Sequence, residues 1–428
     1  MTASLAQQPG SDVISIRQRF SEVRATTMRI TRWLSTEDQM LQSMPDASPA
    51  KWHLAHTTWF FETFILQPYS AGYAPFDPRY RYLFNSYYKQ LGAHPYRGSR
   101  GLLSRPSLDQ VHAYRAHVDA ALLGLLEHAG PDVLELVELG LNHEQQHQEL
   151  ILTDVKHGLW SGPLRPDTID DARPDSAASR LGWMEIDGGI HLIGHEGAGF
   201  AFDNESPRHE VLLQPFRIAS RPVTNAEYLE FMQDDGYRRP ELWLSDGWDT
   251  VCTQGWKAPL YWEQQDNGSW QEFALNGTSE FGMKPVNPSQ PVCHISYYEA
   301  DAYARWCGAR LPSEEEWETA AARMPSRGTF LEDNVFHPQP AHSEGIQHGG
   351  SEQMFGDVWE WTASPYSAYP GFRPAVGLVG EYNGKFMCNQ LVLRGGSCVT
   401  PASHIRASYR NFFPPHARWQ FSGLRLAR

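Results

Sequence analysis

Apolar residues in the first part of the chain recur at alternating steps of three and four, which is the spacing of one face of an α-helix. Such stripes predict helices at about residues 13–34, 48–67, 107–130 and 131–157. The second begins at a serine followed by proline, and Pro68 ends it. The third begins with a capping box, Ser107 with Gln110. Helices of this length and number favour a four-helix bundle.

The pattern changes after the fourth helix. Residues 161–180 are rich in Pro, Asp and Ser, which indicates a linker. Beyond it, short apolar runs alternate with Gly, Pro and Asn turns, and clear helical signals appear only at 296–306 and from Ser313. We therefore expect an α-helical domain at 1–160, a linker at 161–180 and an irregular α+β domain at 181–428. The long segment between the second and third helices, 68–106, is rich in aromatic residues and favours a functional loop.

Composition narrows the class of protein. The formal net charge is −14, which argues against nucleic acid or an acidic membrane as the main partner. No apolar stretch is long enough for a membrane span, and the first twenty residues lack the pattern of a secretory signal. Five cysteines without tight spacing do not indicate a disulfide framework, so a cytoplasmic location is expected. The oligomeric state stays open, and a homo-oligomer is among the alternatives.

The fourth predicted helix carries the sequence HEQQH at residues 143–147. Positions i and i+4 are neighbours on one helical face, so His143 and His147 can share one metal ion. Both fall on the apolar stripe, where buried imidazoles need partners for their nitrogens. The alternative is a pair of core histidines bonded to carbonyls or carboxylates. A third ligand should come from a facing helix, where His56 is the first candidate and His53 the second.

HEQQH also fits the zinc-protease pattern H-E-x-x-H, in which the glutamate is a general base. The extended form of that pattern requires Gly at 150 and His at 153, where this chain has Leu150 and Thr153. A zinc hydrolase is therefore the second candidate class.

Several segments of the second half form a distinctive set. They are FDNESPRHEVLLQPFRIASRPVTNAEY at 202–228, PVCHISYYEADAYARWCGARLPSEEEWETAA at 291–321, GDVWEWT at 356–362, LRGGS at 393–397 and SGLRLAR at 422–428. Residues 181–428 thereby resemble the formylglycine-generating-enzyme (sulfatase-modifying factor) domain, which implies a variant of the C-type lectin fold. One departure is that residues 399–413 contain no cysteine and position 426 is Leu, whereas the formylglycine-generating enzymes carry a catalytic cysteine pair. Oxidation of sulfatase cysteines is therefore not expected.

The first half, through KWHLAHTTWFFE at 51–62 and NHEQQHQEL at 142–150, resembles the DinB-type four-helix bundle, in which three histidines bind a metal. A DinB-type bundle fused to this lectin-like domain is similar to the ergothioneine-biosynthesis sulfoxide synthases. That resemblance implies a non-haem Fe(II) cofactor and small-molecule substrates. The reaction would use O₂ to join cysteine or γ-glutamylcysteine to carbon 2 of the hercynine imidazole, leaving a sulfoxide. It also implies that the lectin-like domain supplies one wall of the substrate pocket.

The resemblance carries over to individual residues. His56, His143 and His147 match the iron ligands, and Gln146 matches a glutamine that contacts hercynine. The segment YRNFF at 409–413 matches a hercynine-pocket segment that usually reads R-N-W-D. Asn411 is retained, while Phe412 and Phe413 replace Trp and Asp. An aromatic ring can still attract the quaternary ammonium. The loss of the acid at 413 favours cysteine over γ-glutamylcysteine as the sulfur donor.

The proton donor and the carboxylate-binding groups are less sharply defined. The pair Tyr87-Tyr88 resembles the catalytic tyrosine of one branch of the family, with Tyr366 and Tyr369 as the alternative. The arginine candidates for the thiol substrate's carboxylates are Arg97 and Arg100, which keep the family spacing, and Arg418. Each arginine could equally be a surface residue, and the tyrosine pair could pack between domains.

Other functions stay open at this point. An ovothiol-type relative would act on histidine at a different imidazole carbon. A bacillithiol-type thiol transferase shares the bundle but usually lacks the lectin-like half. A ligand-binding module would carry out no reaction.

Overall fold

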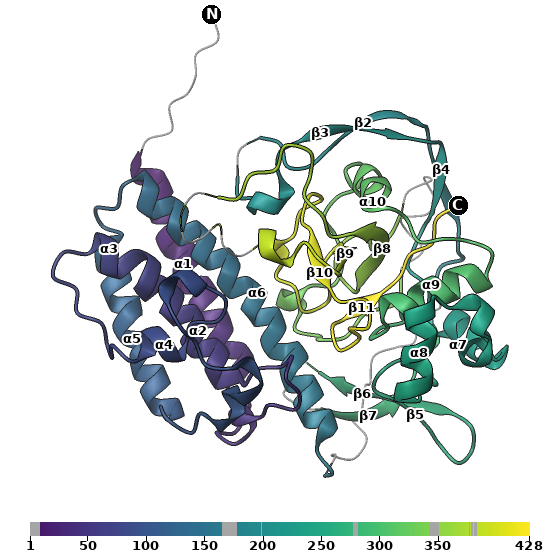
Figure 1. Cartoon of the computed structure of the whole chain (residues 1–428), viewed down its shortest axis with the longest axis horizontal. Coiled ribbons are helices and arrows are strands. Elements are labelled where there is room, and N and C mark those ends of the chain that lie inside the picture. Colours follow the sequence, from purple (N-terminus) through teal and green to yellow (C-terminus); the bar gives the residue numbers. More distant parts are fainter. Residues whose placement is uncertain are drawn as a thin grey trace, which may run out of the picture. The chain divides into compact units, whose positions relative to one another are not determined.

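The chain folds into two compact units, residues 1–161 and 162–428, which are described separately (Figure 1). The computed structural model describes residues 9–164, 178–197, 199–276, 281–341, 351–375, 377, 380 and 383–428. Most of the predicted linker at 161–180 lies outside these residues, and so does the side chain of Val13 in the first predicted stripe.

Unit 1 is built from helices. They are α1 (Pro9–Thr31), α2 (Ala50–Phe61), α3 (Gln67–Tyr69), α4 (Tyr80–Leu83), α5 (Leu108–Leu125) and α6 (Pro131–Ser161). A π-helical turn, Glu62–Leu66, continues α2, and short 3₁₀ helices lie at Asp38–Met40, Lys89–Leu91 and Arg97–Leu102. The long helix α6 packs against α1 and α2, and α2 also packs against α5. The helical character expected for the first half is confirmed, while its likeness to a DinB-type bundle stays a prediction.

Two sequence features set the positions of α2, α5 and α6. Ser107 caps α5 by accepting from the Gln110 backbone N–H, and the Gln110 side chain accepts from the Ser107 backbone N–H. On α6, Gly140 faces Phe61, and a Cβ atom at this glycine would lie 2.5 Å from a carbon of that ring. The missing side chain lets α2 approach α6 closely, one turn before His143.

Unit 2 mixes strands and helices. The strands are β1 (Trp183–Ile186), β2 (Gly189–Ile193), β3 (His209–Leu213), β4 (Phe216–Ala219), β5 (Trp262–Gln264), β6 (Trp270–Leu275), β7 (Phe281–Pro285), β8 (Trp359–Pro365), β9 (Leu391–Arg394), β10 (Asn411–Phe413) and β11 (Ser422–Gly423). The helices are α7 (Asn225–Gln233), α8 (Ser245–Gln254), α9 (Tyr297–Trp306) and α10 (Glu314–Ala321), with 3₁₀ helices at Asp203–Glu205, Gly236–Arg238, Pro240–Leu242, Leu331–Asp333, Gly384–Phe386 and Ala402–His404.

The described strands of unit 2 form four small sheets. β1 pairs with β4, β2 with β3, and β5–β6–β7 form an antiparallel meander. The fourth sheet has the order β10-β9-β8-β11, with β11 parallel to β8 and the other pairs antiparallel. The mixed α and β character predicted for the second half is therefore present.

The segments that carried the family resemblance meet in the core of unit 2. Glu360, from the GDVWEWT segment, accepts from Trp317 Nε1 at 2.6 Å and pairs with Arg425 Nη2 at 2.8 Å. Trp317 comes from the EEEWETAA run and Arg425 from SGLRLAR. All three side chains are buried, so the charges compensate each other inside the fold. Three of the segments that carry the family resemblance therefore contribute side chains to one buried network.

Two helices of unit 2 were not predicted, α7 and α8. Thr224 and Glu227 form a capping box at the start of α7, so the start of this helix could have been predicted from the sequence. The apolar run expected at 183–193 forms two strands, separated by residues 187–188, and the second begins at Gly189, which has a φ of 137°. None of the helices in the described part of the chain combines the length and the apolar character needed to cross a membrane.

Candidate metal centre

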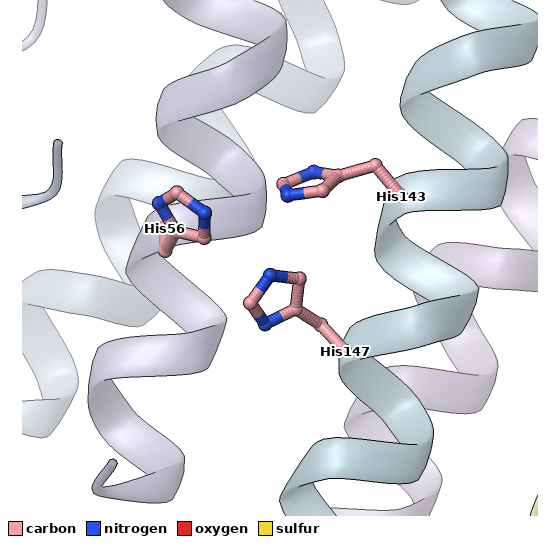
Figure 2. Close-up of side chains that lie close together, drawn as sticks. All are labelled: His56, His143 and His147. Carbon is pink, nitrogen blue, oxygen red and sulfur yellow. The ribbon is translucent and has the colours of Figure 1, made fainter. Parts of the chain in front are cut away.

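Three histidines of unit 1 converge in one buried place. His56 lies on α2, and His143 and His147 lie on α6, one turn apart. One nitrogen of each ring lies within 4.8 Å of the others, and Figure 2 shows the rings turned toward one another. The described residues contain no second group of three His, Cys, Asp or Glu side chains placed in this way.

Burial keeps these imidazoles neutral. Desolvation lowers the pKa of His143 to about 4, and it lowers the pKa of His56 and of His147 well below the usual value. At neutral pH each ring therefore carries one N–H and one lone pair. A metal ion needs ligands in this state.

The hydrogen bonds of two rings indicate which nitrogen would bind the metal. His56 Nδ1 lies 2.6 Å from the carbonyl oxygen of Phe84, which can only accept, so the N–H is on Nδ1. His147 Nδ1 lies 2.7 Å from Nδ1 of His53. In both rings Nε2 is therefore the nitrogen left to bind a metal ion.

The third ring, that of His143, has a nitrogen without a hydrogen-bond partner among the described residues. Within the part of the chain that the structure describes, His143 Nδ1 is buried without a hydrogen-bond partner. Burying an unpaired polar atom is unfavourable, and such an atom in a cluster of three neutral imidazoles indicates an additional group. The residues therefore fit a divalent transition metal, for which imidazole is a common ligand.

Aromatic rings enclose the cluster. His56 stacks on Trp52, with ring centroids 4.5 Å apart, and on Trp59 at 5.4 Å. Phe60 lies 4.9 Å from the ring of His143. This apolar shell excludes water from one side of the site and accounts for the low histidine pKa values.

Glu144 does not belong to the histidine cluster, although it follows His143 directly. Its carboxylate accepts from Arg24 Nη1 at 2.8 Å and from Arg115 Nη2 at 2.9 Å. Burial would raise the Glu144 pKa, but the two guanidinium groups outweigh it and lower the pKa to about 2. A carboxylate that is ion-paired with two guanidinium groups is poorly suited to accept a proton as a general base. These contacts argue against the zinc-hydrolase interpretation of HEQQH, which assigns Glu144 the role of general base.

The structure brings two other candidate residues together, Tyr87 and Arg97. Arg97 Nη1 donates to the Tyr87 hydroxyl at 3.0 Å. Tyr88 is buried, and its ring lies 5.0 Å from Phe64 and 5.7 Å from Trp59. The tyrosine pair thus packs within unit 1, with Tyr88 against the tryptophan that stacks on His56.

Arg100 is buried in the same part of unit 1. Its guanidinium carbon lies 3.4 Å from the Trp52 ring centroid, and Nη1 donates to Ser48 Oγ at 2.9 Å. Burial lowers its pKa to about 9, so the group is still a cation at neutral pH. Gln146 is half-buried on α6, beside His147 in the sequence.

The candidates in unit 2 have different surroundings. Asn411, Phe412 and Phe413 form the half-buried edge strand β10, and Phe412 stacks on Tyr366 at 4.0 Å. Arg418 is buried, lies 3.2 Å from Glu299, and donates to the Ala258 carbonyl. The charge of Arg418 is thus compensated by Glu299 within the fold, and its role in substrate binding stays a prediction.

The alternative tyrosines are also engaged in unit 2. Tyr366 Oη accepts from Asn204 at 2.8 Å, and Tyr369 Oη accepts from Arg394 at 3.1 Å. Both rings are buried, and burial raises the pKa of Tyr369. These contacts favour a packing role over a catalytic one.

Sequence reasoning missed the residues behind the histidine cluster. His53 was considered only as a substitute for His56, and Asp154 was not considered. Asp154 lies seven residues after His147, on the same face of α6. A carboxylate on this otherwise apolar face could have indicated a hydrogen-bond partner for a histidine. Arg24 and Arg115 could not be found in this way, because they reach Glu144 from other helices.

The chain is similar to known proteins both in its second part and over nearly its whole length. Residues 170–428 match the family model described as sulfatase-modifying factor enzyme 1-like domain. The hercynine oxygenase of Mycolicibacterium thermoresistibile is 33% identical, over 96% of this chain and 94% of that protein. The hercynine oxygenase of Mycolicibacterium smegmatis is 33% identical, over 94% of this chain and 96% of that protein. Ergothioneine biosynthesis protein 1 of Schizosaccharomyces pombe is 28% identical, over 54% of this chain and 28% of that protein.

Because the likeness to the first two relatives extends over nearly the whole length of both chains, and the histidine cluster lies within it, this chain belongs to the hercynine oxygenase family.

Proposed function

We propose that this chain is a non-haem iron(II), O₂-dependent sulfoxide synthase of ergothioneine biosynthesis. It would join the sulfur of cysteine to carbon 2 of the hercynine imidazole and give hercynyl-cysteine S-oxide. The observation that carries the proposal is the convergence of His56, His143 and His147 in a chain whose relatives are hercynine oxygenases.

The reaction balances with O₂ as the oxidant. The thiol S–H and the imidazole C2–H bonds break, and a C–S bond and an S–O bond form. One oxygen atom ends in the sulfoxide, and the other leaves as water with the two hydrogens. Four electrons pass from the substrates to O₂.

The three histidines would hold the metal by their neutral imidazoles, and their small number would leave positions for substrates. Iron(II), when bound there, supplies thiolate ligation and the redox chemistry toward O₂. The protein's own part is to fix the rings, through the Phe84 carbonyl for His56 and through His53 for His147.

Tyr87 and Tyr88 are the proposed sources of a proton. The Tyr87 oxygen accepts from Arg97, and the hydroxyl therefore keeps its own hydrogen to donate. The guanidinium also fixes the direction of that oxygen. A positioned proton donor would favour C–S coupling over simple oxidation of the thiol.

Substrate contacts are proposed from the family resemblance. Gln146, Asn411, Phe412 and Phe413 are assigned to hercynine, whose quaternary ammonium suits an aromatic face. Arg97 and Arg100 are assigned to the carboxylate of the thiol substrate. In unit 1, Arg100 remains a cation despite its burial, which supports a role toward an anion.

The decisive experiment measures O₂ consumption by protein loaded anaerobically with iron(II). With hercynine and cysteine we expect one O₂ consumed per sulfoxide, identified by mass spectrometry. The His56→Ala variant should lose both. Histidine in place of hercynine tests the ovothiol-type alternative. Sulfoxide formation that is equal with and without iron, or that occurs only with histidine, would contradict the proposal.

A further inference from the structure

We propose that His53 and Asp154 form a positioning relay behind His147, which fixes the tautomer and orientation of that metal ligand. His53 Nδ1 lies 2.7 Å from His147 Nδ1, and His53 Nε2 lies 3.1 Å from Asp154 Oδ2. The inference rests on the proposed metal site but concerns two residues outside the ligand set.

The hydrogens in this chain of contacts have one consistent arrangement. For His147 Nε2 to offer a lone pair to a metal, the ring's hydrogen must be on Nδ1. His53 Nδ1 must then accept, so the His53 hydrogen is on Nε2. Asp154 Oδ2 receives that hydrogen, because an ionised carboxylate only accepts. The opposite direction would place hydrogen on His147 Nε2 and prevent binding.

The relay is held at its far end. Asp154 Oδ2 also accepts from the backbone N–H of Ser48 at 2.8 Å, just before α2 begins. His53 and His56 are on α2, and His147 and Asp154 are on α6. The carboxylate therefore links the start of α2 to the helix that carries two of the proposed ligands.

Both members of the relay are shielded from water. His53 is 2% exposed, and Asp154 is 7% exposed. Water cannot easily replace either partner, so removing one leaves the His147 N–H unsatisfied or lets the ring turn. In metal sites, losing such an outer partner typically weakens affinity about 10–100-fold.

The test is the affinity of the protein for cobalt(II) alone, measured by competition with a chromophoric chelator. His53→Phe removes the acceptor, and we expect a Kd increase of about 10–100-fold. Asp154→Asn should shift Kd in the same direction. His53→Asn retains an oxygen near the place of Nδ1 and should bind more tightly than His53→Phe. The cobalt(II) absorption spectrum reports whether the geometry of the ligands changes.

A matched control is available on the same helix. His157 lies three residues after Asp154 and contacts Ser43 Oγ through Nδ1 at 2.7 Å. His157→Gln also removes a partly buried, hydrogen-bonded imidazole from α6, and it should leave the cobalt Kd and spectrum unchanged. An effect of His157→Gln as large as that of His53→Phe would overturn the relay, because any loss of packing would then suffice.

The outcomes separate this inference from the proposed function. If His56→Ala loses cobalt while His53→Phe and Asp154→Asn bind as wild type does, the relay is overturned and the metal site stands. If His56→Ala also binds normally, the metal site fails, and the relay and the proposed function fail with it. Should His53→Phe not fold, the nitrogen-15 spectrum of zinc-loaded wild type decides. Hydrogen on His147 Nδ1 and His53 Nε2 supports the relay, and hydrogen on His147 Nε2 overturns it.

Discussion

Glu144 Oε2 accepts a 2.8 Å hydrogen bond from Arg24 Nη1, although the residue is the immediate neighbour of His143 in HEQQH. A step of one residue turns a helix by about 100°, so neighbours in sequence present different faces. On its own face Glu144 also meets Arg115, and the three side chains join α1, α5 and α6 in one buried network. The motif that suggests a hydrolase thus has one face that carries the candidate metal ligands and one structural face.

The first prediction concerns stability. Glu144→Gln removes the negative charge that compensates Arg24 and Arg115, so we expect the free energy of unfolding to fall by about 3 kcal/mol. The measurement is urea unfolding at neutral pH. Glu138→Gln on the same helix is the matched control, because Glu138 pairs with Arg19 at a partly exposed position and should cost less than about 1 kcal/mol.

If the Glu144→Gln protein is as stable as wild type but has lost its activity, the result would support a role of Glu144 as a base. The pKa of about 2 argues against it, since a carboxylate with so low a pKa is a weak base.

The second prediction concerns the tyrosine pair. Tyr87→Phe and Tyr88→Phe remove only a hydroxyl group each, and each should lower kcat for sulfoxide formation, by about 100-fold for the residue that donates the proton. The measurement is sulfoxide yield per O₂ consumed, because a lost proton donor should shift product toward thiol oxidation. Tyr73→Phe is the control, since the Tyr73 hydroxyl donates to Glu62 at 2.7 Å and has no proposed part in the reaction. Unchanged turnover in both variants would remove the pair from the site.

The third prediction concerns pH and unit 2. His404 is fully buried against Tyr409 and Phe202, and burial, followed by the charge of Arg406, lowers its pKa well below the usual value. The native ring stays neutral, whereas the unfolded chain binds a proton below about pH 6.5. The contribution of His404 to stability is therefore present above that pH and is lost as the pH falls.

His404→Gln removes this titration. Between pH 6 and 5, the free energy of unfolding should fall more steeply in wild type than in the variant, by about 1.4 kcal/mol per pH unit. Urea unfolding at several pH values measures both slopes. Because other buried histidines contribute equally to both proteins, equal slopes would show that His404 is protonated in the native state.

Local signals account for what could be predicted from the sequence. The capping box at Ser107 depends on residues three apart and begins a helix in the structure, and the helical signals at 296–306 and from Ser313 are equally local and also correspond to helices. The i, i+4 spacing of His143 and His147 is equally local. The start of α7 carries a similar box and was overlooked, because it is embedded in a run of short strands.

Most relationships between distant segments could not be predicted. His56 was the first candidate for the third ligand, but no spacing rule gives the close approach of α2 to α6 at Gly140 that brings its ring to the other two. Arg115 reaches Glu144 from α5, and Arg24 reaches it from α1, 120 residues away. Such pairs depend on which helices pack together, and composition and periodicity do not determine this.

The fourth prediction concerns the sulfur donor and a single substitution on β10. Phe413 occupies the position where the family segment usually has Asp, and its half-buried ring contacts Trp419 edge-on, with centroids 6.2 Å apart. An apolar ring cannot bind the amino group of γ-glutamylcysteine as a carboxylate can, so cysteine should have the higher kcat/KM in wild type. Phe413→Asp should move the ratio toward γ-glutamylcysteine by about 10-fold, which is one charge-assisted hydrogen bond at a partly exposed site. Phe413→Asn is the control for size and polarity without charge. If wild type already prefers γ-glutamylcysteine by a wide margin, residue 413 does not set donor choice, and the carboxylate-binding role proposed for Arg97 and Arg100 becomes the next determinant to vary.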